Sequence, residues 1–325
     1  MWRLLLKLLC TVVLAAELLF AQTGQLTEAQ AFSAIELATN PSTKLAAAEE
    51  FINRFPNSNS RIKAAELVAA EILKVQNGTV AIALVQRAHT IFTTDKEREI
   101  LKPVALEAYA TGNRSKDAFK LAAEILAKNP DDLYVLIQMT SAGAEEVRKR
   151  NREHVEVALQ YGLKAIALIE ARPKVPRVAG DLSNSSSLDY ASELGSLYQQ
   201  TAILYLGKGN TDEAKARLSK ATTLRPDDPS NYALLGRVMH ADYVTQMEAY
   251  EGLPEGKQKQ ETLKKLDALL DPIIDAYAHA AGLALGRQEY VQLMQQVIPD
   301  LTTYYKYRNN QSTKGLQQLI HKYKR

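Results

Sequence analysis

Residues 195–240 carry the feature that most constrains this fold, a pattern of large and small side chains that restarts 34 residues later. The first part of the pattern is formed by Tyr198, Thr201, Ala202 and Tyr205. After the turn at 207–210 and a second helix, the same spacing returns at Tyr232, Leu235, Gly236 and Met239. A pattern that restarts in phase predicts stacked helical hairpins. An ordinary hairpin within a helical bundle is the alternative.

The second helix of this stretch has small residues where two helices must approach closely. Ala214 and Ala221 flank Leu218, and Pro226 follows as the helix stop. Antiparallel helices approach closely only where side chains are small, and proline ends a helix because it lacks an N–H. This order of residues resembles the tetratricopeptide repeat. The resemblance implies an all-α, helical-hairpin solenoid (a TPR-like α-α superhelix) that holds other molecules.

The rest of the chain shows the same spacing in a degenerate form. Small residues mark further second helices at Ala81, Ala118 and Ala158, and the intervals from one to the next, ending at Ala214, are 37, 40 and 56 residues. We therefore predict degenerate repeats over residues 22–246 and a helical C-terminal extension or cap over residues 247–325. The apolar N-terminal stretch, the alanine-rich repeats and the tyrosine-rich tail together resemble tetratricopeptide proteins of the secreted bacterial type.

Turn and cap residues predict several boundaries. Thr27 followed by Gln30 has the spacing of a capping box, which begins a helix. Residues 172–187 contain prolines, a glycine and a serine run, which indicate a surface loop. That loop is either a tolerated insertion or a recognition element. The Asp271-Pro272 pair is expected to interrupt or restart a long helical stretch over residues 258–285.

Tyrosines are enriched late in the chain, beside Lys306 and Arg308. Tyrosines next to basic residues are common at protein interfaces. At helical spacing, however, Tyr304 and Tyr307 are expected to pack beneath the last helix as part of the core.

Residues 1–21 are typical of a secretory signal peptide. Arg3 and Lys7 precede an apolar run that ends at Ala21. An uncleaved N-terminal membrane anchor is the alternative, and it would be the chain's only membrane contact. Cys10 is the one cysteine, so the mature chain would contain no disulfide. We expect an exported protein of the periplasm or cell envelope.

Charge and composition argue against nucleic-acid binding and against catalysis. The formal net charge is only +3, whereas nucleic-acid binding requires a clustered basic face. No two of the five histidines are spaced i, i+4, and the sequence has no nucleophile-elbow or phosphate-binding glycine motif. His240, Asp242 and Glu248 could share a metal, but a solvated helix end is the preferred interpretation. We expect no enzyme activity, no metal and no cofactor.

The resemblance implies that a protein or peptide partner binds the concave face formed by the first helices of the repeats. The residues at inward positions are Gln199, Ile203, Leu206, Ala233, Arg237 and His240. Only Arg237 suits a carboxylate, so an apolar or mixed groove is expected. Two other hypotheses are an accessory or degenerate envelope enzyme, with a site in the C-terminal helices, and a structural envelope component held by its N-terminus.

Overall fold

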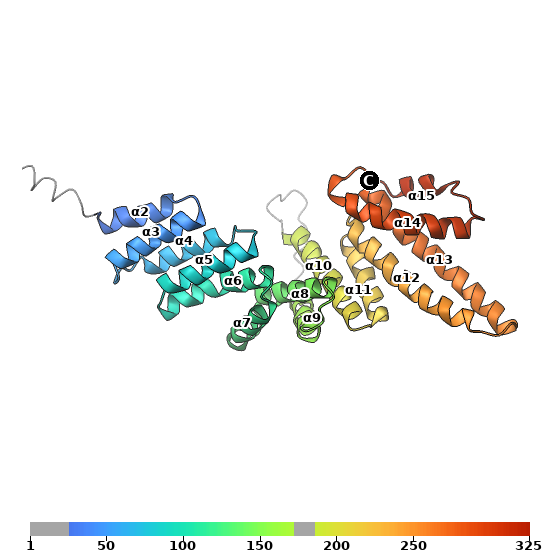
Figure 1. Ribbon diagram of the computed structural model, residues 1–325, viewed down its shortest axis with the longest axis horizontal. Helices are drawn as coiled ribbons and strands as arrows, with labels where there is room; N and C mark the ends of the chain where they lie inside the picture. The colour runs from blue at the N-terminus through green and yellow to red at the C-terminus, as the bar shows by residue number, and fades with distance from the viewer. Residues whose placement is uncertain (1–25, 172–185) are drawn as a thin grey trace, which may run out of the picture. The chain divides into compact units, whose positions relative to one another are not determined.

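The computed structural model describes residues 26–171 and 186–325, and every regular element in these ranges is helical. The all-α prediction is therefore confirmed. The chain divides into two compact units, residues 1–121 and 122–325, and the helix α7 (Ser115–Lys128) contains the boundary. Most successive described helices within each unit pack against each other as hairpins (Figure 1).

The described part of the first unit, residues 26–121, contains five complete helices, which pack in overlapping pairs. They are α2 (Glu28–Leu37), α3 (Pro41–Arg54), α4 (Arg61–Ile72), α5 (Gly78–Ile91) and α6 (Asp95–Thr111). Local caps set several of their starts. Thr27 and Gln30 form the predicted capping box at α2, and Thr94 forms another with Glu97 at α6. Asn77 caps α5 by accepting a hydrogen bond from the Val80 amide.

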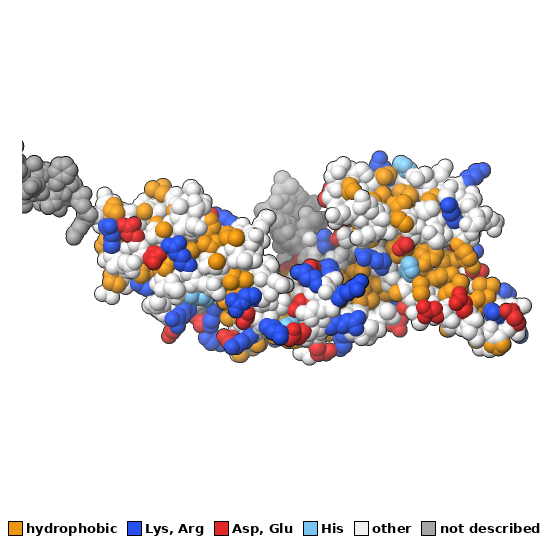
Figure 2. All heavy atoms as spheres, in the orientation of Figure 1, with side chains coloured by type: hydrophobic (Ala, Val, Ile, Leu, Met, Phe, Trp, Pro, Cys, Tyr) orange, Lys and Arg blue, Asp and Glu red, His pale blue; other side chains and the backbone are white. Residues whose placement is uncertain are grey.

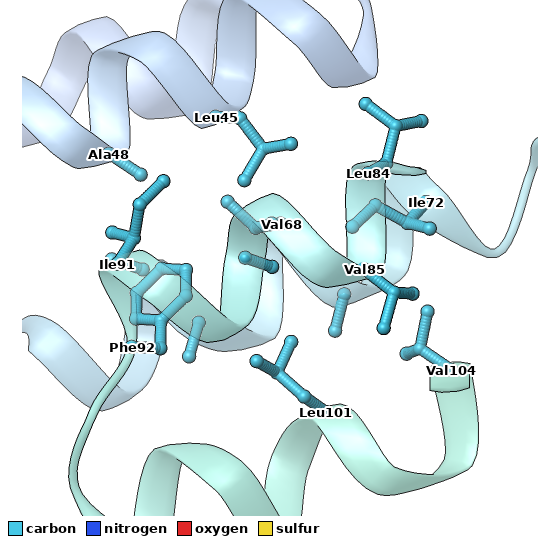
Figure 3. Close-up of a cluster of buried hydrophobic side chains, with 14 of the residues drawn as sticks. Leu45, Ala48, Val68, Ile72, Leu84, Val85, Ile91, Phe92, Leu101 and Val104 are labelled. Atoms are coloured by element: carbon cyan, nitrogen blue, oxygen red, sulfur yellow. The ribbon is translucent and has the colours of Figure 1, made fainter. Parts of the chain in front are cut away.

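The core of the first unit consists of aliphatic side chains, alanines and phenylalanines. Side chains from α3, α4, α5 and α6 meet in one cluster (Figure 3). Ala48, Ala64, Ala65 and Ala88 are fully buried there, which allows the helices to approach closely. Phe51 and Phe92 fill the larger gaps.

The second unit begins its array with α8 (Leu133–Arg148), α9 (Val155–Glu170), α10 (Ser186–Gly207) and α11 (Thr211–Leu224). The helix α10 packs against α8, α9 and α11. The repeat register predicted for α10 and α11 agrees with their burial, since Ala202, Ala214, Leu218 and Ala221 are all 0% exposed. The helix α11 ends at Leu224, two residues before Pro226.

A second core in this unit joins α12 (Pro229–Glu251), α13 (Lys257–Ala284), α14 (Val291–Arg308) and α15 (Leu316–Lys322), with a 3-10 turn at Gln288–Tyr290 before α14. Both α14 and α15 pack on α13 (Figure 1). Tyr277 is fully buried at the centre, where its ring lies against Gly236 of α12. Tyrosines recur around it, in contrast to the first unit.

Three expectations need correction. The Asp271-Pro272 pair does not interrupt α13, because the turns that follow are buried on most sides and their packing outweighs one missing backbone hydrogen bond. The predicted division at residue 246 falls inside α12, which contributes Tyr243 and Met247 to one core. Tyr304 is half-buried, as expected, but Tyr307 is 47% exposed.

Two sequence predictions fall mainly on residues that the structure does not describe. The signal peptide, residues 1–21, lies wholly outside the described part of the chain. The predicted loop 172–187 lies outside it up to residue 185, and α10 already begins at Ser186. Among the described helices, none combines the length and the apolar character that crossing a membrane requires.

Candidate functional site

Two of the residues predicted to line a concave binding face are buried in the protein core. The packing of α10 against its neighbours leaves Ile203 only 5% exposed. Ala233 is 0% exposed and belongs to the core that α12 shares with α13. The prediction is therefore wrong for both residues, because neighbouring helices fill the space that a regular array leaves open.

Gln199, another predicted contact, is used within the fold. Its side-chain amide donates to Oδ1 of Asn231 at 2.7 Å, and the Asn231 amide donates to the carbonyl of Ala221 at 3.4 Å. Asn231 is fully buried, so these bonds satisfy polar groups away from water and join α10, α11 and α12. Leu206 is half-buried and packs against the Ala214–Leu218 cluster.

The last two predicted residues keep some accessible surface. Arg237 is exposed on α12. His240 is half-buried, with Nδ1 3.9 Å from a carboxylate oxygen of Asp300 and its ring edge-on to Tyr304 at 5.3 Å. These contacts draw His240 towards α14. Arg237 thus remains the one fully accessible member of the predicted set.

A cleft of about 420 Å³ lies between α9, α10 and α11, on a different part of the repeat. It is bordered by Glu170, Tyr190, Leu194, Tyr198, Lys220 and Thr223. Tyr198, which was expected only to support the fold, is 2% exposed and projects its hydroxyl towards this cleft. The volume falls within the usual range of ligand pockets, about 300–1,000 Å³.

Three polar groups form a hydrogen-bonded chain along this cleft. The Tyr198 hydroxyl donates to Glu170 Oε1 at 2.5 Å, and Lys220 Nζ donates to the Tyr198 oxygen at 3.1 Å. Lys220 Nζ also lies 4.9 Å from the centre of the Tyr198 ring, a cation–π distance. Burial, and then the hydrogen bond to Glu170, raise the pKa of Tyr198, so the hydroxyl stays protonated at neutral pH.

The cleft therefore presents an apolar floor with one acidic and one basic group at its rim. Leu194 and the rings of Tyr190 and Tyr198 supply the apolar surface. Basic and acidic side chains are interspersed over α9, α10 and α11 on the face shown in Figure 2. This arrangement suits an extended polypeptide with mixed side chains better than a polyanion, which needs an uninterrupted basic surface.

A second hollow of about 420 Å³ lies between α13, α14 and α15. Its strongest polar groups are already paired with each other, since Arg308 donates two hydrogen bonds to Asp271, at 2.8 and 3.2 Å. No group of three or more metal-ligating side chains occurs within residues 26–171 and 186–325. Asp242, once considered with His240 and Glu248, pairs with Lys215.

Sequence reasoning missed Glu170 and Lys220 because neither occupies a position that defines the repeat. Glu170 ends α9, immediately before the segment that interrupts the 34-residue spacing. Lys220 lies one residue before Ala221 on the outer side of α11. The available signal was Tyr198, because a buried tyrosine needs a hydrogen-bond partner from a neighbouring helix.

No protein-family model matches this chain, and no curated protein matches it. Among solved structures, it is similar to a monomeric mutant of IFIT1 with Gppp-AAAA, at 17% identity over 87% of this chain and a TM-score of 0.44. A second IFIT1 mutant, with m7Gppp-AAAA, gives 17% identity over 87% and a TM-score of 0.43. This chain spans 55% of the length of both.

Proposed function

We propose that this chain is a non-enzymatic helical-repeat scaffold that binds an extended segment of a partner protein in the cleft between α9, α10 and α11. One observation carries the proposal. The cleft combines an apolar floor with the Glu170–Tyr198–Lys220 chain, and three helices of adjacent repeats hold these groups in place. Pre-positioned polar groups around an apolar floor are typical of binding sites.

A displayed library of random peptides, screened against the mature chain, tests this function. Glu170→Arg and Lys220→Glu should each weaken the selected peptides, because each reverses a charge at the rim. Lys265→Glu, a charge reversal at an exposed position on α13, is the matched control and should leave binding unchanged. Folding is checked by circular dichroism, since an exposed substitution usually changes stability by less than about 0.5 kcal/mol.

The concave face remains the rival location for binding. Arg237→Glu alters its one fully accessible predicted residue without touching the cleft. Peptides that lose affinity for Arg237→Glu but bind the Glu170 and Lys220 variants normally would place the site on the concave face and refute the cleft. An RNA oligonucleotide run in the same assay tests the nucleic-acid alternative. Binding of RNA, with no peptide selected, would refute the protein-partner proposal.

Export to the periplasm or cell envelope is part of the proposal, and the signal-like residues 1–21 support it. Intact-mass measurement on protein from a cell-envelope fraction should give a mature N-terminus near Gln22. Recovery of the uncut chain with membranes would favour the anchor instead. The accessory-enzyme alternative is tested by metal analysis of the same material, in which a stoichiometric metal would argue for hidden chemistry.

A further inference from the structure

The helix pair α12–α13 repeats the α10–α11 pair with an extended turn. Tyr198 and Tyr232 occupy the same position of the first helix, 34 residues apart. The register of the second helix follows from the ring contacts, since His279 stacks on Tyr232 as Lys220 lies over Tyr198. Ala214, Leu218 and Ala221 then correspond to Ile273, Tyr277 and Ala280, and all six are at most 1% exposed. In this register, Lys220 corresponds to His279 and Thr223 to Gly282.

In the later repeat, a side chain of the same protein occupies the place that no described residue fills in the earlier one. Tyr323, just after α15, stacks on His279 at 4.1 Å, and His279 stacks on Tyr232 at 3.8 Å. Gly282 provides the necessary space, since a Cβ there would lie 2.5 Å from the carbonyl oxygen of Ile320 and 2.6 Å from Cβ of Tyr323. Tyr323 therefore lies against the counterparts of two residues that border the open cleft.

The later repeat also has an acidic residue next to the position that corresponds to Glu170, and that residue is already paired. Ala165 and Ala221 occupy the same position in two successive repeats. Glu170 lies five residues after Ala165, so its counterpart is Pro226, five residues after Ala221. Asp227 directly follows this counterpart. Arg325 forms an ion pair with Asp227. The tail, defined as residues 323–325, thus presents an aromatic ring and, two positions later, a guanidinium group to the later repeat.

We infer that the open cleft binds a partner segment with an aromatic residue followed two positions later by a basic residue, the arrangement that Tyr323 and Arg325 present to the equivalent place. This inference rests on the proposed function and names the partner's chemistry. An incoming ring would lie beside the Lys220 ammonium group, where a cation–π contact takes the place of the His279 stack. The incoming basic group would pair with the carboxylate of Glu170, whose Oε1 accepts a hydrogen bond from Tyr198.

The two places differ in one respect that affects how deeply a ligand can enter. Thr223 has a side chain where Gly282 has none, so a ligand backbone cannot approach α11 as closely as the tail approaches α13. The side chains of the ligand, rather than its backbone, should then make most of the contacts. Recognition should accordingly depend strongly on the aromatic residue.

A synthetic peptide with the sequence of residues 319–325, acetylated and fluorescently labelled, tests the inference on the full mature chain by anisotropy. Replacing its tyrosine by alanine should weaken binding about tenfold, the usual effect of removing an aromatic anchor. Replacing its last arginine by glutamate should weaken binding about threefold, because the pair is exposed to solvent. The chain variant Glu170→Arg should weaken the original peptide and restore binding of the glutamate peptide.

Asp227→Asn separates the open cleft from the filled one. The substitution removes only the ion pair between Asp227 and Arg325 of the tail, so binding of the added peptide in the open cleft should not weaken. A loss equal to that of Glu170→Arg would show that the peptide merely replaces the tail, which overturns the inference. Library peptides that need the cleft but lack the aromatic–basic spacing would also overturn it, while leaving the proposed function intact. If neither library nor peptide binds, both proposals fail.

Discussion

The core of α2–α6 and the core of α12–α15 are built from different aromatic residues. In the first, Phe51 and Phe92 are the largest fully buried side chains, surrounded by alanines and aliphatic residues. In the second, Tyr277 is buried and several more tyrosines pack around it. A phenyl ring has no polar atom to satisfy, whereas each buried tyrosine hydroxyl needs a partner. The tyrosine-rich core therefore depends more on specific polar contacts and on pH.

The largest expected loss of stability is in the first unit. It tests whether the core of that unit depends as little on polar contacts as the comparison suggests. The most deeply buried charged residue of the unit is Glu97, which accepts two hydrogen bonds from Arg61 at 2.7 and 3.0 Å. Burial alone would raise the pKa of Glu97, but the bonds from Arg61 and Thr94 outweigh it and lower the pKa. Arg61→Ala should cost about 3–5 kcal/mol, because it leaves a buried charge unpaired.

Urea unfolding followed by circular dichroism, with hydrogen exchange of α4–α6 to localise the loss, measures this effect. Arg87→Ala is the matched control, since Arg87 and Glu49 form an exposed pair at 2.8 Å. It should cost at most about 1 kcal/mol. Equal losses in the two variants would mean that Glu97 finds another partner and that its pair with Arg61 is not critical for the first unit.

The next effect compares two tyrosine hydroxyls. Tyr198→Phe removes the hydrogen bond to Glu170 and should cost about 0.5–1.5 kcal/mol. Tyr277→Phe should be neutral or stabilising, because the Tyr277 hydroxyl is buried without a hydrogen-bond partner among the described residues. Thermal unfolding of both variants measures the difference. A larger loss in Tyr277→Phe would indicate a buried water or another partner at that hydroxyl.

A smaller effect concerns pH in the α12–α15 core. Burial lowers the pKa of His279, and Lys322 lowers it further, against an opposing effect of Asp275. The unfolded chain, with an ordinary histidine pKa near 6.5, takes up this proton before the folded chain does. Stability contributed by neutral His279 is therefore present above that value and is lost as pH falls below it.

His279→Phe keeps an aromatic ring between Tyr232 and Tyr323 but cannot titrate. The variant should lose less stability than the original chain between pH 7.5 and pH 5.5, as measured by hydrogen exchange of α13 and α15. An unchanged pH dependence would assign the effect to other groups. His89 in the first unit, whose pKa is lowered by burial and by Arg98, is present in both chains. It is therefore the internal reference for the pH dependence that His279→Phe should leave unchanged.

The smallest effect is expected at the exposed edge of the tyrosine-rich region. Tyr307 is 47% exposed, so Tyr307→Ala should change stability by less than about 0.5 kcal/mol. Tyr304, in contrast, is half-buried, and its ring lies edge-on to Tyr243 at 5.8 Å. Burial and Asp300 raise the pKa of Tyr304 to about 12. A large loss in Tyr307→Ala would show that the tyrosine core extends further outward.

The sequence allowed the fold to be predicted where short-range chemistry determines it. The Thr27–Gln30 capping box and the register of Ala214, Leu218 and Ala221 depend on residues close together in the chain. Pro272 misled because long-range packing of α13 overrides a local helix breaker. The same limit applies to the site.

The cleft could not be predicted because it depends on contacts between repeats. Glu170, Tyr198 and Lys220 come from three helices, and the interruption after Glu170 removes the period that would have related them. Ile203 and Ala233 were placed by the geometry of a regular array. Packing within this chain buries both residues, and no spacing along the sequence reveals such burial.

Gly282 holds the tail in place against α13. Tyr323 and Ile320 reach α13 only because this residue has no side chain. A Gly282→Val chain should release the tail, because the valine side chain would occupy the place of Tyr323. On the inference above, the released tail would then compete with ligands for the cleft between α9, α10 and α11, at an effective concentration on the order of millimolar, as tethered segments do. One glycine would thus decide whether the chain carries a competitor for its own proposed binding cleft.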